Sequence, residues 1–353
     1  MSQPVLHRPT RRWAGLVWGT AAMALSMLAS VKWGWTQIDW TSLFTAYTTD
    51  TPTREQLVVQ STRVPRALIA ASVGASLAMA GALMQALTRN PLASPGIFGI
   101  NAGAAFFVVA ATSFFTVSSL QSYTWIAFAG AAVAGLMVTL LGSSGRTGLT
   151  PIKLTLAGAA MTALFSTLTQ GILVMDQRTL EEVLLWLSGS IVGRKVETLL
   201  SVLPFFAAAW ILTLALSSPI TTLVIGEDVA KGLGQRTAWV KAGAALCVVL
   251  LAGGAVAVAG PISLVGLLVP HIARILVGYD YRWVIPYCFV LGGTFLLLAD
   301  IGARYLIMPG GPVMAWLTGT GAKVSVDEVP VGVITALLGV PFFITIARRS
   351  LSH

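Results

Sequence analysis

Residues 63–103 read RVPRALIAASVGASLAMAGALMQALTRNPLASPGIFGINAG, and this stretch decides the fold of the chain. Residues 67–88 form a run of 22 residues without a charge, and about 20 apolar residues suffice for a helix that crosses a membrane. A TRNPLASPG turn follows, and apolar sequence then resumes through closely spaced glycines. Proline removes a helical hydrogen bond, and glycine widens the range of backbone conformations. The stretch therefore predicts two membrane helices joined by a sharply broken connection.

The composition extends this membrane pattern over the whole chain. Hydrophobic residues make up 56% and charged residues 10% of the sequence, whereas about a quarter of the residues of soluble domains are charged. Residues 90–145 form a run of 56 residues without Asp, Glu, Lys or Arg, which is long enough for two crossings. Further charge-free runs are 13–31, 154–175, 198–226, 242–273, 283–299 and 329–347. We therefore predict an all-α, polytopic membrane protein of about ten transmembrane helices, with residues 1–353 in a single domain.

The net charge of +9 is distributed in a way that indicates topology. With the amino terminus inside and alternating helices, the inner segments hold 13 Lys and Arg against 3 acids. The outer segments hold 9 Lys and Arg against 10 acids. This asymmetry follows the positive-inside rule, so the basic balance indicates orientation in a membrane and not binding to nucleic acid. We therefore predict that the tail 1–12 and the segment 218–241 lie on the inner side and that the extended loop 303–328 lies on the outer side.

Two further segments fit this topology. The first apolar run follows a basic tail and resembles a secretory signal, but its 19 residues exceed the roughly 7–15 of a signal core. We therefore expect an uncleaved first helix. Residues 179–187 read TLEEVLLWL, an amphipathic pattern that predicts a short helix along the outer surface.

A faint internal repeat links two of the predicted helices. Residues 76–81, SLAMAG, resemble residues 255–260, AVAVAG, and each segment precedes a stretch broken by Gly and Pro. In the predicted topology the two helices run in opposite directions, as expected for an inverted repeat beside a translocation path. Close packing of helices rich in small residues explains the similarity equally well.

Five segments together resemble one family, the FecCD-type permeases. Besides the stretch around TRNPLASPG, they are IGEDVAKGLGQRT at 225–237, GPISLVGLLVPHIARILVG at 260–278, LLLADIGARYL at 296–306 and DEVPVGVITALLGVPFFITIARR at 327–349. Members of this family are membrane subunits of ABC importers for ferric siderophores, haem and cobalamin. The resemblance implies a multi-pass permease in the cytoplasmic (inner) membrane of a prokaryote, surrounded by lipid. The partners it implies are cytoplasmic ABC ATPase subunits, an extracytoplasmic substrate-binding protein and a second permease subunit.

The segment 225–237 is the expected joint to the ATPase. Acids at the amino end of a short helix suit the helix dipole. The resemblance implies that the coupling residues are Gly226, Glu227, Asp228, Ala230 and Gly234. The residues alone fit a solvated loop helix without a partner equally well. Because the chain contains no GxxxxGK[ST] string, we expect a separate subunit to hydrolyse ATP and expect no catalytic residue in this chain.

Three arginines lie at the outer ends of two predicted helices, namely Arg63, Arg66 and Arg304. The resemblance implies that they receive carboxylates of the binding protein, and interfacial anchoring is the alternative. Asp300 lies four residues before Arg304, which predicts a structural pair on one helix face. A proton relay through Asp300 is the alternative, although relays usually need several intramembrane acids.

Breaks and isolated polar residues in the membrane segments mark the expected structural and translocation-path positions. They are Asn90, Pro91, Pro95, Gly96, Asn101, Pro261, Pro270, His271 and Asp300. An intramembrane His is a functional candidate by default. No second His or carboxylate accompanies His271 in the sequence, which favours a structural role, and we expect neither a metal site nor a cofactor.

The expected function is ATP-driven import of a ferric siderophore by alternating access. The 3 His are not clustered and the 2 Cys lie in apolar spans, so a path for a bare metal ion is not indicated and a bulky chelate is favoured. Cobalamin or haem is the nearest alternative, and the sequence does not separate these cargoes. An ion-coupled secondary transporter would need paired intramembrane acids, and an intramembrane enzyme would need a nucleophile and base. The loop 305–327 is longer than the link usual in the family.

Overall fold

The computed structural model describes residues 4–6, 8–34, 38–49, 51–115, 117–144, 150–306 and 328–351, and these ranges contain helices and no strand. The helices are α1 (Pro9–Lys32), α2 (Trp40–Thr45), α3 (Arg54–Val58), η1 (Val59–Arg63), α4 (Val64–Thr88), η2 (Pro95–Phe98), α5 (Ile100–Phe115), α6 (Leu120–Ser143), α7 (Pro151–Met175), α8 (Gln177–Leu187), α9 (Val196–Ile225), α10 (Glu227–Gly232), α11 (Thr237–Ala259), α12 (Val265–Val277), α13 (Tyr281–Leu306) and α15 (Val331–Leu351). Most of the predicted outer loop, residues 307–327, lies outside the described residues, as do residues 1–3 and 7 of the predicted tail.

The predicted all-α membrane fold is confirmed. In the described part of the chain, seven helices are long and apolar enough to cross a membrane. They are α1, the continuous helix Arg54–Thr88, α6, α7, α9, α11 and α13. The shorter apolar helices α5, α12 and α15 account for the remaining charge-free runs. The charge-free runs of the sequence therefore correspond, within the described residues, to the seven long helices and the three shorter ones.

The second membrane helix begins earlier than the sequence predicts. A capping box between Thr53 and Gln56 starts a helix that continues through the π-helical turn η1 into α4. Arg63 and Arg66 therefore lie inside a continuous helix and not at its start. A π-turn widens the helix locally and is frequent at functional sites.

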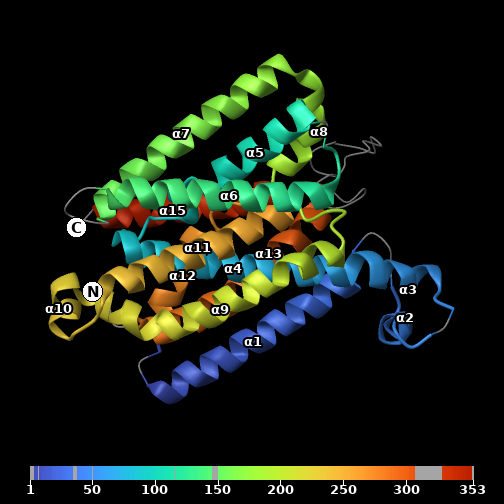
Figure 1. Cartoon of the computed structure of the whole chain (residues 1–353). Helices are drawn as coiled ribbons and strands as arrows, with labels where there is room; N and C mark the ends of the chain where they lie inside the picture. The colour runs from blue at the N-terminus through green and yellow to red at the C-terminus, as the bar shows by residue number, and fades with distance from the viewer. Residues whose placement is uncertain are drawn as a thin grey trace.

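The ends of the helices lie at the two ends of the bundle in the order that the charge pattern predicts. α1 begins and α15 ends at the end of the bundle that carries α10, whereas α2, α3 and α8 lie at the opposite end (Figure 1). The backbone N–H groups of Val5 and Leu6 donate to the carbonyls of Ile275 and Leu276, which joins the start of the chain to the end of α12. We refer to the α10 end as the inner end and to the α8 end as the outer end.

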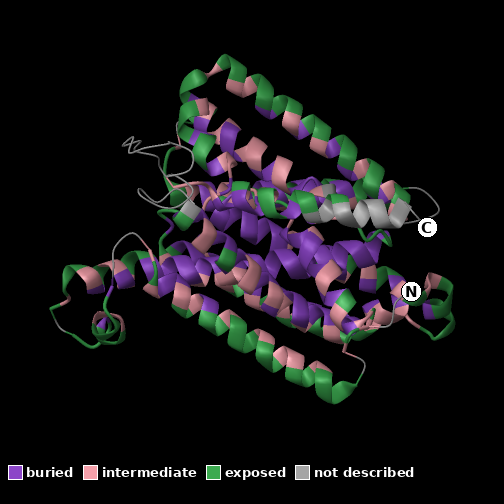
Figure 2. Cartoon of the chain, turned by 180° about the vertical axis from the view of Figure 1, so that it is seen from behind, coloured by how far each residue is buried: buried purple, intermediate pink, exposed green. Residues whose placement is uncertain are grey.

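The helices α4, α11 and α13 form the buried centre, and α1 and α7 lie outside them and are largely exposed (Figure 2). Many of the exposed side chains of α1 and α7 are apolar. α4 runs from the outer to the inner end, where Arg89 donates to the Leu223 carbonyl of α9 at 3.4 Å. α11 returns to the outer end, where Gly260 approaches the Trp186 carbonyl of α8. The helices that carry SLAMAG and AVAVAG therefore run in opposite directions, as predicted, and the inverted repeat itself stays a prediction.

The predicted surface helix is also confirmed. The amphipathic segment forms α8, in which Val183 and Trp186 are buried while Leu184 is exposed. Both cysteines, Cys247 and Cys288, are free and buried among apolar residues.

Candidate functional site

Two interruptions break the membrane helices, one before α12 and one after α4. α12 has 13 residues and is about 20 Å long, shorter than the ~30 Å hydrocarbon layer of a membrane. Residues 260–264 precede it without helical structure, and Leu264 adopts a left-handed conformation with a φ of 71°. The other interruption separates the end of α4 at Thr88 from the start of α5 at Ile100. Non-helical backbone at membrane depth is tolerated where protein surrounds it or where it lines a cavity.

Gly81, Gly266 and Pro95 bring these two interruptions into contact. A Cβ atom at Gly81 would lie 1.8 Å from the carbonyl oxygen of Gly266. A Cβ atom at Gly266 would lie 2.8 Å from the carbonyl oxygen of Leu77 and 2.9 Å from Cδ of Pro95. Only glycine permits so close an approach of two backbones. The buried Pro95, one of the predicted path residues, therefore packs directly on the start of α12.

A side-chain amide supplies the hydrogen bond that Pro270 removes from α12. In an α-helix each N–H donates to the carbonyl four residues earlier, so proline at 270 leaves the Gly266 carbonyl without its helical donor. Nε2 of Gln85 lies 3.4 Å from that oxygen and 3.3 Å from the carbonyl oxygen of Leu267. Gln85 is buried, and it is not among the predicted site residues. The sequence feature that could have identified Gln85 is its long polar side chain within the charge-free run 67–88.

The turn between α4 and α5 has local causes. Arg89 ends α4 with a φ of 50°, and Oδ1 of Asn90 accepts from the backbone N–H of Leu92 at 2.9 Å, which forms an Asx turn. The predicted path residues of this region are distributed as follows: Asn90 and Pro91 in the exposed turn, Pro95 and Gly96 in η2, and Asn101 in the first turn of α5. Pro261 lies at the outer end, where its carbonyl approaches Gly189.

Asp300 is the centre of an ion-pair cluster at the outer ends of α4 and α13. The side chain is fully buried and accepts from Nε of Arg66 at 2.9 and 3.1 Å and from Nε of Arg304 at 3.1 Å. Nη1 of Arg66 also pairs with Oε2 of Glu328 at 2.5 Å. The predicted pair between Asp300 and Arg304 is confirmed, and two charges from distant parts of the sequence join it. Buried charges are tolerated when they are paired and hydrogen-bonded in this way.

The three predicted docking arginines are buried. Arg63, Arg66 and Arg304 are 6%, 5% and 3% exposed. Nη1 of Arg63 donates to the Trp33 carbonyl at 2.5 Å, and Nη1 of Arg304 donates to the Ser30 carbonyl at 2.8 Å. The three arginines therefore lie inside the bundle, because backbone carbonyls at the end of α1 and nearby carboxylates supply acceptors there. A role of these arginines in docking stays a prediction.

The predicted coupling segment forms α10, which projects at the inner end beyond α9 and α11 (Figure 1). Glu227 accepts from Nζ of Lys241 at 2.8 Å and pairs with Nζ of Lys231 at 3.2 Å. The hydrogen bond from Lys241, followed by the one from Lys231, holds the pKa of Glu227 below its ordinary value. Gly234 ends the segment with a φ of 79°, a conformation that other residues adopt only with strain. These contacts fix the orientation of α10.

The predicted coupling residues lie on different faces of α10. Ala230 is 0% exposed and packs within the chain, so it is not part of the accessible surface. Val229 and Leu233 are 50% and 73% exposed, and the acidic Asp228 is exposed in the first turn. The surface that another protein can reach therefore presents the apolar side chains of Val229 and Leu233 beside the exposed Asp228 and Lys231.

His271 lies half-buried at the inner end. It lines a cavity of about 600 Å³ together with Arg12, Arg274 and Asp280. The guanidinium carbon of Arg274 lies 5.9 Å from the ring centre of Tyr279, within cation–π range. The surroundings of His271 are thus basic, and its structural role stays a prediction.

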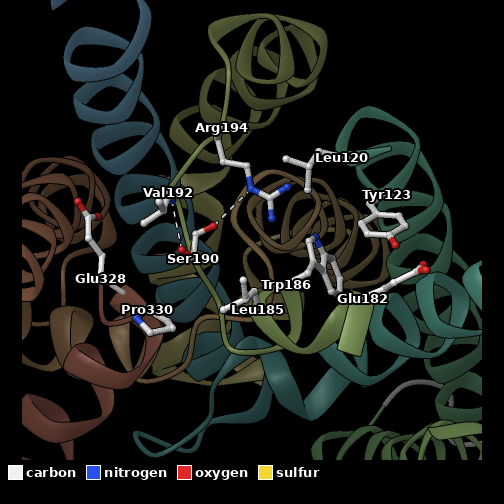
Figure 3. Close-up of a pocket in the computed structure, with 10 residues that line it drawn as sticks. All are labelled: Leu120, Tyr123, Glu182, Leu185, Trp186, Ser190, Val192, Arg194, Glu328 and Pro330. Carbon is white, nitrogen blue, oxygen red and sulfur yellow. Dashed lines mark hydrogen bonds between the residues drawn. The ribbon is translucent and has the colours of Figure 1, made fainter. Parts of the chain in front are cut away.

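A second cavity, at the outer end, is not among the predicted sites. It measures about 620 Å³ and is lined by Leu120, Tyr123, Glu182, Leu185, Trp186, Ser190, Val192, Arg194, Glu328 and Pro330. Figure 3 shows the guanidinium group of Arg194 extending among these side chains. Burial lowers the pKa of Arg194 to about 10. The sequence feature that could have pointed to this cavity is an arginine in the short link between α8 and α9.

Comparison with known proteins adds independent evidence. A family model described as the FecCD transport family matches residues 22–349. The protein YfiZ of Bacillus subtilis, named as a siderophore transport system permease, is 51% identical to this chain over 98% of both chains. FepD of Escherichia coli, named as a ferric enterobactin transport system permease protein, is 38% identical over 93% of this chain and 92% of its own.

A solved structure shares the fold. It is described as an inward-facing conformation of a metal-chelate type ABC transporter and matches with a TM-score of 0.79 at 28% identity. The match covers 95% of this chain and 98% of that chain, so the likeness extends over the whole helical bundle.

Proposed function

This chain belongs to the FecCD transport family, and from that membership we propose that it is the permease subunit of an ATP-driven importer that carries a ferric siderophore across the cytoplasmic membrane. The observation that carries the proposal is the 51% identity, over 98% of both chains, to a permease named for siderophore transport. The relative named for ferric enterobactin transport supports the same class of cargo. The cargo in this proposal is an iron chelate and not a bare metal ion.

The inner face supports docking to a separate ATPase subunit. Val229 and Leu233 expose apolar side chains on a helix whose orientation is fixed by Glu227. Exposed apolar patches rimmed by polar residues are typical of surfaces that bind another protein. Binding of ATP by such a partner would move α10, and the motion would reach the bundle through α9 and α11.

The central junction supports alternating access. Discontinuous helices that meet inside the bundle are typical of transporters in which parts of the structure rock around a central path. Here the interruption after α4 and the one before α12 meet at Gly266. Asp300 is held by Arg66 and Arg304, which leaves it poorly suited to the proton exchange that an ion-coupled transporter requires.

The ATPase contact can be tested by changing the exposed face of α10. Val229→Glu combined with Leu233→Glu should reduce co-purification of the ATPase subunit at least about tenfold, a change of roughly 1.4 kcal/mol in binding free energy. The matched control is Leu184→Glu with Leu185→Glu, the same change at exposed apolar residues of the outer helix α8. Full retention of the ATPase by the α10 variant would contradict the proposed coupling surface.

The cargo can be tested by uptake of labelled compounds into cells that express the permease with its ATPase and binding protein. A labelled ferric siderophore should accumulate in an ATP-dependent manner. Accumulation of cobalamin or haem in its place would contradict the siderophore assignment while leaving the importer assignment intact.

A further inference from the structure

The outer cavity contains a buried arginine, Arg194, that forms no ion pair within the described residues. Arg194 is 6% exposed, and its Nε donates to the Ser190 carbonyl in a long bond of 3.4 Å. Its Nη1 has no hydrogen-bond partner among the described residues. A buried charge without a partner is strongly unfavourable in a folded protein, so such a group calls for a physical explanation.

A second unpaired donor lies in the same cavity. Nε1 of Trp186 is buried and has no acceptor in the described part of the chain. Figure 3 shows this nitrogen on the side of the indole where the guanidinium of Arg194 lies. Arg194 and Trp186 thus offer a cation and a neutral N–H donor to one space. Guanidinium groups form strong, paired hydrogen bonds with carboxylates.

The carboxylates at this cavity are bound to other arginines. Oε1 of Glu182 pairs with Nε of Arg178 at 3.1 Å, and Oε2 of Glu328 pairs with Nη1 of Arg66 at 2.5 Å. Each of these carboxylates thus has another arginine as its partner, and in the described part of the chain no ion pair joins either one to Arg194. The charge of Arg194 remains for a ligand that enters the cavity.

We propose that this cavity is a subsite for an anionic iron chelate, in which Arg194 and Trp186 bind a free carboxylate of the ligand. The assignment rests on the proposed import of a ferric chelate. The volume of about 620 Å³ lies within the range of roughly 300–1,000 Å³ typical of small-molecule sites. Leu185, Val192 and Pro330 supply apolar walls, which strengthen an ionic contact by excluding water.

The proposal selects among classes of chelate by charge. Ferric complexes of polycarboxylates retain negative charge and free carboxylate oxygens. Three hydroxamate groups neutralise one ferric ion, so a ferric trihydroxamate carries no net charge for Arg194 to bind. The subsite therefore favours the carboxylate class over the neutral hydroxamate class.

A cysteine in the cavity wall tests the proposal. Val192 is 40% exposed and lines the cavity, so Val192→Cys places a reactive thiol beside Arg194, while Cys247 and Cys288 are buried. The variant would be purified with its ATPase in phosphatidylcholine nanodiscs, without binding protein. Rates of modification would be measured with a sulfonate-bearing and a trimethylammonium-bearing methanethiosulfonate.

We expect the ratio of the sulfonate rate to the trimethylammonium rate to be at least about fivefold higher in Val192→Cys than in the same variant with a further Arg194→Gln change. Citrate should protect the thiol, and a neutral ferric trihydroxamate should not. The matched control is Arg54→Gln, which removes an exposed arginine of the outer helix α3 that does not line the cavity. That change should leave both the rate ratio and the protection unaltered.

Several outcomes would overturn the subsite. Equal protection in the Arg194→Gln variant would show that the arginine does not bind the anion. Protection that requires the binding protein would assign the carboxylate to that protein, and protection that requires phosphatidylglycerol would assign the site to a lipid headgroup. If the complex retains its ATPase but citrate does not protect the thiol, the subsite is refuted and the proposed coupling stands. If citrate protects the thiol but the ATPase does not co-purify, the proposed coupling is refuted and the subsite stands.

Discussion

The side-chain amide of Gln85 in α4 donates to the carbonyl oxygen of Gly266 in α12, the oxygen that loses its helical donor because residue 270 is proline. The two residues are 181 positions apart in the sequence. The contact lies beside the place where Gly81 and Gly266 approach, so backbone packing and a buried hydrogen bond hold the same junction. A change at this junction should affect both the stability of the bundle and the movement of α12 against α4.

Gln85→Leu should lower the free energy of unfolding by about 1–3 kcal/mol, because it leaves a buried carbonyl without a donor. Pro270→Ala restores an N–H that can bond the Gly266 carbonyl. The same Gln85→Leu change should therefore cost less in the Pro270→Ala background, as measured by denaturation of the detergent-solubilised complex. Equal costs in both backgrounds would mean that the amide stabilises the protein in some other way.

Gly81→Ala should destabilise the bundle by about 1–3 kcal/mol or more, because its Cβ would meet the backbone of Gly266, which cannot rotate away. Gly171→Ala in α7 is the matched control, since a Cβ there meets nothing within 4 Å. That control should be neutral or slightly stabilising, because alanine is the better helix former. Thermal unfolding of the two variants measures the difference, and similar melting temperatures would contradict the close approach.

Asp300→Asn should lower the free energy of unfolding by about 3–5 kcal/mol, since it leaves Arg304 as an uncompensated buried charge and leaves Arg66 with Glu328 as its remaining carboxylate. Glu182→Gln breaks the surface pair with Arg178 and should have little effect, because exposed ion pairs contribute little. Yield of folded protein and resistance to proteolysis provide the measurement. Wild-type behaviour of the Asp300→Asn variant would show that the cluster is not structural.

Glu227 should stabilise α10 only where it is ionised. Its pKa is lower in the folded state than its ordinary value of 4.5, so the stabilisation is present above that value and is lost as the pH falls through and below it. The difference in stability between wild type and Glu227→Gln should therefore be largest near neutral pH and should vanish in acid. Lys241→Gln should reduce this difference more than Lys231→Gln, because Lys241 makes the shorter and less exposed contact. A difference that grows on acidification would have the wrong sign for this mechanism.

The sequence by itself determined the helices, their orientation and several local features. Charge-free runs set the membrane spans, because a helix in a bilayer needs an uncharged segment of fixed minimum length. The distribution of Lys and Arg indicated the inner and outer ends. The pair between Asp300 and Arg304 was predictable because residues four apart share a helix face. The turn after α4 was predictable from its prolines and glycines.

Only the tertiary structure decided which faces of these helices meet. α4 and α11 are apolar all round, so their sequences contain no polar face from which their neighbours could be inferred. The pairing of Arg66 with Asp300 joins residues 234 positions apart, and it places inside the bundle an arginine that the sequence alone puts at the outer end of a helix. Ala230 lies on the buried face of α10, and Arg194 meets Trp186 at a cavity formed by several helices. The local sequence determines where a helix forms and where it lies along the membrane normal. The contacts between helices depend instead on how closely two backbones approach and on which charges pair, and both involve residues from the whole bundle.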